Sequence, residues 1–172
     1  MKLSLETLGN LPENVVRPDY DRAALTPGIV HIGLGNFHRA HMALYLHDLF
    51  QKGRDQNWAI IGAGVRPSDR QIRDDLAAQD WLSTVCELDP AGDKAMVTGA
   101  MIDFLPVESG NGPLIAAMSN PAIGIVSLTV TEGGYYIDAA TGDFDPDHPD
   151  MIQDAATPDQ PNSAFGAMIA AL

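Results

Sequence analysis

The chain has 172 residues, of which 45% are hydrophobic and 19% are charged, a balance typical of a folded globular domain. Its formal net charge of −13 argues against binding to nucleic acids or anionic membranes, because such partners select clustered Lys and Arg. Cys86 is the only cysteine, which excludes an intramolecular disulfide, and neither a signal peptide nor a membrane-spanning stretch is recognisable. We therefore expect one soluble, cytoplasmic domain.

The first strand and helix are expected after a polar arm. Residues 1–27 are polar and punctuated by prolines, which indicates an extended N-terminal arm. The apolar run GIVHIGL, residues 28–34, predicts a strand that turns at Gly35 into a helix ending near Gly53. One face of that helix is expected to carry the apolar residues Met42, Tyr45, Leu46, Leu49 and Phe50.

A second strand and helix follow, and then a hairpin. The run WAIIGAGV, residues 58–65, predicts the strand, and Ser68 with Gln71 has the spacing of a capping box for a helix from Asp69 to about residue 79. Residues 81–88 and 94–102 flank the turn-forming DPAGD and predict a β-hairpin. Cys86 lies in that hairpin, so we expect a small buried residue rather than a nucleophile.

The last third of the chain predicts one strand between two helices. A short helix is expected after Pro113, and AIGIVSLTVT, residues 122–131, predicts a strand that is buried on both faces. Beyond Tyr136 the sequence is rich in Asp and Pro, which predicts a surface loop up to Asn162 or Ser163, one of which caps a final helix. Phe165, Met168, Ile169 and Leu172 are expected to form an apolar stripe along that helix.

The turn after the first strand has the composition of a dinucleotide-binding turn. Gly33 permits a tight turn, and Gly35, which lacks a Cβ, permits close approach of the backbone to a pyrophosphate at the helix N-terminus. His38 and Arg39 are expected to add local positive charge. The third glycine of the usual fingerprint would fall at position 38, so the pattern alone also fits a purely structural turn.

Two longer strings add a family resemblance. GIVHIGLGNFHRAH, residues 28–41, and IVSLTVTEGGY, residues 125–135, resemble the mannitol dehydrogenase family of long-chain polyol and sugar-acid dehydrogenases, and the resemblance extends over nearly the whole chain. It implies a Rossmann-like α/β sheet with an inserted β-hairpin, and NAD(P)-dependent interconversion of polyols with ketoses, or of hexonates with keto acids, without a catalytic metal. The cofactor contacts that it implies are Ile32, Gly33, Leu34, Gly35, Asn36, Phe37, His38 and Arg39, with Thr131, Glu132 and Gly133 near the nicotinamide.

The position of Thr131 and Glu132 also has a physical reading, because both follow a strand at the edge where open α/β sheets bind ligands. The alternative is that residues 132–134 only end the strand. After the second strand, Asp69 is the acid that would bind the adenosine ribose and Arg66 the base that would favour a 2′-phosphate, and we predict NAD over NADP. Asp69 would equally suit the first turn of a helix as a dipole partner.

The catalytic half of such an enzyme is not visible here. The resemblance implies a Lys base with Asn and His partners in a helical second domain, and Lys2, Lys52 and Lys94 match none of those positions. We therefore expect an arm over residues 1–27 and a Rossmann domain over residues 28–172 that is truncated before the catalytic domain. Such a domain is expected to be inactive by itself. It is also expected to have an exposed sheet edge that favours self-association. The leading prediction is the cofactor-binding half of an NAD-dependent mannitol 2-dehydrogenase. The alternatives are a fructuronate-type hexuronate reductase and a non-catalytic dinucleotide-binding module.

Overall fold

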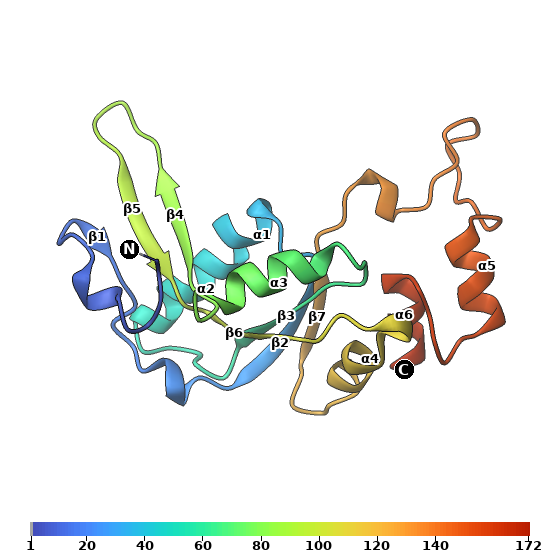
Figure 1. Ribbon diagram of the computed structural model, residues 1–172, viewed down its shortest axis with the longest axis horizontal. Coiled ribbons are helices and arrows are strands. Elements are labelled where there is room, and N and C mark those ends of the chain that lie inside the picture. Colours follow the sequence, from blue (N-terminus) through green and yellow to red (C-terminus); the bar gives the residue numbers. More distant parts are fainter. Residues whose placement is uncertain (1) are drawn as a thin grey trace.

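A parallel sheet of four strands forms the centre of the protein. The computed structural model describes residues 2–172, except for the side chain of Glu132. The strands lie in the order β6-β3-β2-β7, and every neighbouring pair is parallel. Their bounds are Pro27–Ile32 for β2, Ala59–Ala63 for β3, Met101–Phe104 for β6 and Ile125–Leu128 for β7. The chain adds β3 and β6 on one side of β2 and then returns to place β7 on the other, so the strand order reverses between β2 and β7 (Figure 1).

Helices cover both faces of this sheet (Figure 1). The helices α2 and α3 pack on one face, and α4 and α6 pack on the other. The helical bounds are α1 Asn36–Ala40, α2 Met42–Gln51, α3 Asp69–Ala77, α4 Gly112–Met118, α5 Pro149–Ala156 and α6 Ala164–Ala170. Short 3₁₀ turns lie at Leu8–Asn10, Arg22–Ala24, Ser109–Asn111 and Glu132–Gly134.

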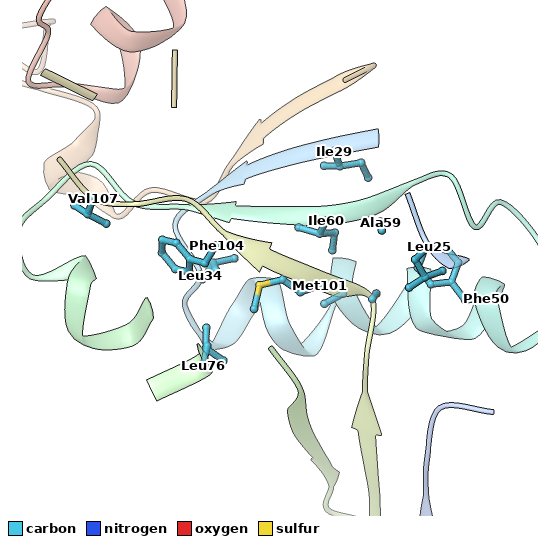
Figure 2. Packing of buried hydrophobic residues seen from close by; sticks show 12 residues of the cluster. Leu25, Ile29, Leu34, Phe50, Ala59, Ile60, Leu76, Met101, Phe104 and Val107 are labelled. Carbon is cyan, nitrogen blue, oxygen red and sulfur yellow. The ribbon is translucent and has the colours of Figure 1, made fainter. Parts of the chain in front are cut away.

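The larger core lies between the sheet and the α2–α3 layer. Ile29, Ile60 and Phe104 point from β2, β3 and β6 toward Phe50 of α2 and Leu76 of α3 (Figure 2). Successive side chains of a strand point to opposite sides of the sheet, so the neighbours of Ile29 in β2 face the other helical layer. Val30 and Ile32 accordingly pack with a second cluster that contains Leu114, Ala164 and Ala167.

The predicted hairpin is present and lies outside the central sheet. Strand β4, Ser83–Glu87, pairs antiparallel with β5, Lys94–Thr98, and the two-residue strand β1, Val15–Val16, pairs parallel with β5. The hairpin projects from the body of the molecule (Figure 1). Cys86 is exposed on it, so the prediction of a buried cysteine is wrong. Ser83 and Val97 are buried at the base of the hairpin, whereas Cys86 lies farther out, where the hairpin projects.

Besides the pairing of β1 with β5, one arginine makes three contacts between the N-terminal arm and the body. The Arg22 guanidinium donates hydrogen bonds to the carbonyl oxygens of Asp80 at 3.0 Å, Gly99 at 3.0 Å and Met101 at 2.8 Å. Asp80 precedes β4, Gly99 follows β5 and Met101 begins β6, so one side chain connects the arm to both sheets.

Several local predictions need correction. The first helix is interrupted at His41, whose backbone (φ −123°, ψ −85°) separates α1 from α2, and Tyr45 on the expected buried face is 62% exposed. In the final helix, Phe165 and Met168 of the apolar stripe are partly buried and Ile169 and Leu172 are exposed, while Ala164 and Ala167 are buried against α4. Small side chains permit the close approach of these two helices.

Strand β7 differs most from its prediction. The strand is shorter than the apolar run, Ile125 and Val126 are 42% and 38% exposed, and among the described residues only β2 pairs with it. A continuous apolar run indicates burial only where both a neighbouring strand and a covering layer exist. The expected exposed sheet edge is therefore present at β7. None of the helices over residues 2–172 combines the length and the apolar character that a bilayer crossing requires.

Candidate functional site

A pocket of about 410 Å³ lies at the carboxyl ends of β2, β3 and β7. The turn after β2 contributes Ile32 to Gly35, and the segment after β3 contributes Val65, Arg66, Ser68 and Asp69. The segment after β7 contributes Thr129, Val130, Thr131, Gly134 and Tyr136. Open parallel sheets bind ligands at the point where their strand order reverses, and here that point is between β2 and β7.

Glycine occupies positions 33 and 35 of the turn for different structural reasons. Gly33 has φ +92°, and a Cβ there would overlap the carbonyl oxygen of Thr129, so the fold itself requires glycine. Gly35 precedes α1 with an ordinary φ of −67°, and no described atom lies within 4 Å of the place that its Cβ would take. Protein packing therefore explains Gly33, whereas the open space beside Gly35 fits a ligand that approaches the backbone.

Asp69 is the acidic group of the pocket. Its Oδ2 accepts hydrogen bonds from the backbone N–H groups of Val65 and Arg66, both at 2.9 Å. Asp69, rather than the predicted Ser68, thus organises the start of α3, since Ser68 makes no side-chain capping bond and has helical φ and ψ. Among residues 2–172, no hydrogen bond is made to Asp69 Oδ1, which leaves an anchored carboxylate with one oxygen for a ligand.

The segment after β7 closes the pocket on its other side. Thr131 lines the pocket, and a 3₁₀ turn follows in which Gly134 N–H donates to the Thr131 carbonyl at 2.7 Å. Gly134 lines the pocket and Gly133 does not, while the Glu132 side chain lies outside the described part of the chain. The predicted and the observed pocket residues of this segment therefore overlap at Thr131.

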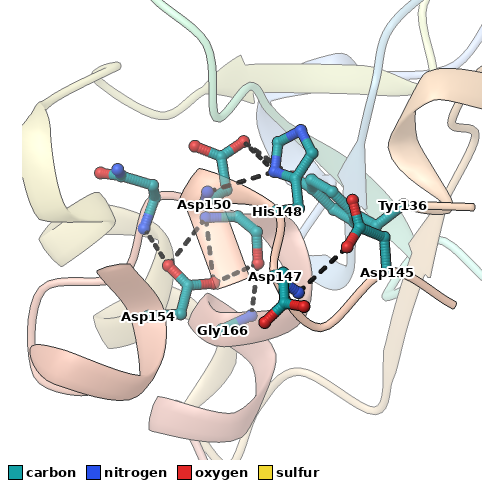
Figure 3. A network of polar contacts seen from close by, with 9 residues as sticks. Tyr136, Asp145, Asp147, His148, Asp150, Asp154 and Gly166 are labelled. Carbon is teal, nitrogen blue, oxygen red and sulfur yellow. Dashed lines mark hydrogen bonds and ion pairs between the residues drawn. The ribbon is translucent and has the colours of Figure 1, made fainter. Parts of the chain in front are cut away.

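Tyr136 is a pocket residue that sequence reasoning missed. Its hydroxyl donates to Asp150 Oδ2 at 3.3 Å and its ring meets His148 edge-on, with centroids 4.7 Å apart (Figure 3). Burial, followed by the nearby Asp150 carboxylate, raises the pKa of this phenol. The only sequence signal was an aromatic pair at the end of the TEGGYY string.

The segment that holds Tyr136 was predicted as a loop but contains α5. Asp154 of α5 accepts hydrogen bonds from the Asn162 N–H at 2.6 Å and from the Ser163 hydroxyl (Figure 3). Ser163 in turn caps α6 by accepting from Gly166 N–H at 2.9 Å. Helix α5 begins at Pro149, and proline is common in a first helical turn. Pro149 is therefore consistent with a helix start, but the high content of Asp and Pro in the segment favoured the prediction of a loop.

The remaining residues of the predicted cofactor set lie elsewhere. Phe37 and His38 line a separate groove of about 600 Å³ between α1, α2 and β7. Arg39 lines a third cavity, beside α3, and binds Asn36 Oδ1 through its guanidinium. Burial and then the neighbouring His31 lower the pKa of His38 to about 3, so His38 is neutral at pH 7 and the expected positive charge from it is wrong. The structure thus brings together Ile32 to Gly35, Asp69 and Thr131.

Comparisons with known proteins agree with one another. Residues 27–172 match the family described as the mannitol dehydrogenase Rossmann domain. Mannitol 2-dehydrogenase of Cereibacter sphaeroides is 65% identical over 162 residues, which are 94% of this chain and 34% of that protein. The polyol:NADP oxidoreductase of Gluconobacter oxydans is 40% identical over 173 residues, covering 99% of this chain and 35% of that protein.

Solved structures show the same relationship. Pseudomonas fluorescens mannitol 2-dehydrogenase, in a ternary complex with NAD and D-mannitol, is 42% identical, with a TM-score of 0.91, and the match covers 99% of this chain and 35% of that chain. A substrate-free D-sorbitol dehydrogenase is 38% identical with a TM-score of 0.86. The predicted Rossmann-like fold is confirmed. The chain spans about a third of the length of these relatives.

Proposed function

Because the chain belongs to the mannitol dehydrogenase family, we propose that it is the cofactor-binding part of an enzyme that oxidises a secondary alcohol of a polyol. The observation that carries this proposal is the pocket in which the open backbone at Gly35, the carboxylate of Asp69 and Thr131 surround the point of strand reversal. We assign this role to residues 28–172, with residues 1–27 as an arm that Arg22 attaches to the domain.

Each part of the pocket suits one part of a dinucleotide. The backbone of Gly33 to Gly35 would hold the pyrophosphate, which a side chain at Gly35 would obstruct. The free oxygen of Asp69 would accept hydrogen bonds from the adenosine ribose. Thr131 lies in the segment that follows β7, where the nicotinamide side of the site is expected. That ring, when bound, accepts or donates the hydride.

We propose NAD as the preferred cofactor. A 2′-phosphate beside the Asp69 carboxylate would meet like charge, and two backbone N–H groups prevent that carboxylate from turning away. Arg66 also lines the pocket and would attract the phosphate. The name of the Gluconobacter relative includes NADP, so both cofactors occur among the relatives. We propose that the opposing effects of Asp69 and Arg66 determine which of the two this chain prefers.

The substrate that we propose is mannitol, which would be converted to fructose. Mannitol appears in the names of the Cereibacter and Pseudomonas relatives, and sorbitol in that of a further solved structure. A fructuronate-type hexuronate remains the second candidate. No lysine lines the pocket, and Lys94 lies on the projecting hairpin 3.9 Å from Glu87. We therefore also propose that residues 1–172 bind cofactor without turning over substrate, as a non-catalytic module would.

Titration with NADH and NADPH, followed by nicotinamide fluorescence, tests the proposal. We expect saturable NADH binding that Gly35→Asp abolishes, because the new carboxylate would occupy the space proposed for the pyrophosphate. Gly9→Asp is the matched control, since a Cβ there also meets open space but lies outside the pocket. Absence of NADH binding by the folded wild-type chain, or equal loss in both variants, would refute the cofactor role.

A further inference from the structure

Thr129 connects β7 to the glycine turn by two hydrogen bonds. Its backbone N–H donates to the Ile32 carbonyl at 2.9 Å, and its hydroxyl donates to the Gly33 carbonyl at 2.6 Å. The Gly33 N–H donates to the Ala63 carbonyl of β3 at 3.0 Å. The positive-φ residue of the turn is therefore bonded on both sides, to β3 through its N–H and to the end of β7 through its carbonyl.

His31 extends this connection, and its proton positions follow from the geometry. A carbonyl oxygen can only accept, so the Thr129 hydroxyl proton is used on Gly33 and Thr129 Oγ1 must accept from His31 Nε2, 3.1 Å away. His31 Nδ1 then carries the lone pair and accepts from the Ser127 hydroxyl at 2.8 Å. The alternative acceptor for Ser127 is Met42 Sδ at 3.9 Å, a weak one.

The result is a chain of hydrogen bonds that runs in one direction, from Ser127 through His31 and Thr129 to the Gly33 carbonyl. Burial lowers the pKa of His31 to about 4, so the ring is neutral near pH 7, as this chain requires. His31 is 1% exposed, and the His38 ring stacks on it with centroids 3.7 Å apart. The imidazole ring in the middle of the chain of bonds is thereby shielded from water, while Ser127 and Thr129 are half-buried.

We propose that His31 and Thr129 are positioning residues for the cofactor: they orient the Gly33–Leu34 peptide plane, and so the Leu34 N–H, in the geometry that binds a pyrophosphate. The peptide unit is planar, so a fixed Gly33 carbonyl fixes the direction of the Leu34 N–H. Gly33 and Leu34 both line the pocket. Glycine is the residue least restricted in φ and ψ, so this turn needs an external restraint. The inference rests on the proposed dinucleotide site.

The matched pair Thr129→Val and Thr129→Ser tests the role of the hydroxyl. Valine keeps the branched shape and removes both hydrogen bonds of Oγ1, whereas serine keeps them. We expect Thr129→Val to raise the Kd for NADH about five- to tenfold, as for one lost hydrogen bond, and Thr129→Ser to stay within about twofold of wild type. Circular dichroism establishes that the three proteins are equally folded. Equal affinities in wild type and Thr129→Val, or equal loss in both variants, would overturn the positioning role.

Nitrogen NMR of His31 gives a readout that is independent of the cofactor. The chemical shifts distinguish a protonated ring nitrogen from one with a lone pair, and we expect the proton on Nε2 in wild type and a redistribution toward Nδ1 in Thr129→Val. A wild-type proton on Nδ1 would overturn the hydrogen-bond chain. Failure of the wild-type protein to bind NADH, with His31 protonated on Nε2, would instead overturn the proposed function and leave the chain of bonds supported.

Discussion

Acidification is expected to destabilise this protein through two stacked histidines. Burial lowers the pKa of His31 to about 4 and that of His38 to about 3, whereas both would titrate near 6.5 in the unfolded chain. As the pH falls below 6.5, the unfolded state takes up protons that the folded state does not. The contribution of these histidines to stability is therefore fully present above pH 6.5 and is lost as the pH falls from 6.5 to about 4 for His31 and to about 3 for His38.

The magnitude follows from the size of these shifts. Each pKa unit corresponds to about 1.4 kcal/mol, so lowering the pH from 7 to 5 costs about 2 kcal/mol for each of the two histidines. Burial also lowers the pKa of His47, which acts in the same direction. A loss of about 4 kcal/mol is a large part of the 5–15 kcal/mol that stabilises a typical domain.

Urea unfolding at pH 7 and pH 5, followed by tryptophan fluorescence, measures this loss. His38→Phe should remove about half of it and should not lower the free energy of unfolding at pH 7, because neither His38 ring nitrogen has a partner in the described structure. His41→Gln, at an exposed histidine, serves as the control and should keep the loss. A free energy of unfolding that is equal at both pH values, or a His38→Phe variant with the wild-type pH dependence, would refute the reasoning.

Two further outcomes concern the pocket and the sheet edge. Asp69→Asn keeps an oxygen for the Val65 and Arg66 N–H groups but removes the charge, so relative affinity for NADPH over NADH should rise about tenfold in fluorescence titrations. An unchanged ratio would contradict the role of that carboxylate. Val126→Lys places a charge on the exposed edge strand and should shift the protein toward monomer in light scattering, with NADH affinity retained. Equal self-association in both proteins would show that another surface is responsible.

The sequence allowed prediction of those elements whose signals are local. The strands β2 and β3, the hairpin and the stop of α2 at Gly53 follow from apolar periodicity and glycine, which act over a few residues. Gly33 and Asp69 were expected in the site, and both line the pocket. The start of α3 could not be predicted as well. Ser68 and Asp69 are neighbouring residues that can both accept a capping hydrogen bond, and only the geometry of the turn determines that Asp69 does so.

Other features depended on contacts that no local pattern contains. The apolar run of β7 gave no sign that the strand would be an exposed edge, because burial depends on which strands become its neighbours. The position of Tyr136 beside the pocket depends on its hydrogen bond to Asp150 of α5, and α5 is in turn bonded to the start of α6 through Asp154. His38 lies three residues after Gly35, yet the break at His41 and the packing on His31 place it in a different groove.

The hydrogen bond between His31 and Ser127 spans 96 residues, and this separation has a consequence for folding. The unit formed by β2, α2 and β3 is local and can form early, whereas pairing of β7 requires closure of a much longer loop and is expected to be slow. A nascent or cleaved chain that stops before Thr129 would contain the complete glycine motif without the bond that orients it. Competence to bind the cofactor would therefore arise late in folding, and a bound dinucleotide would favour chains in which β7 has joined the sheet.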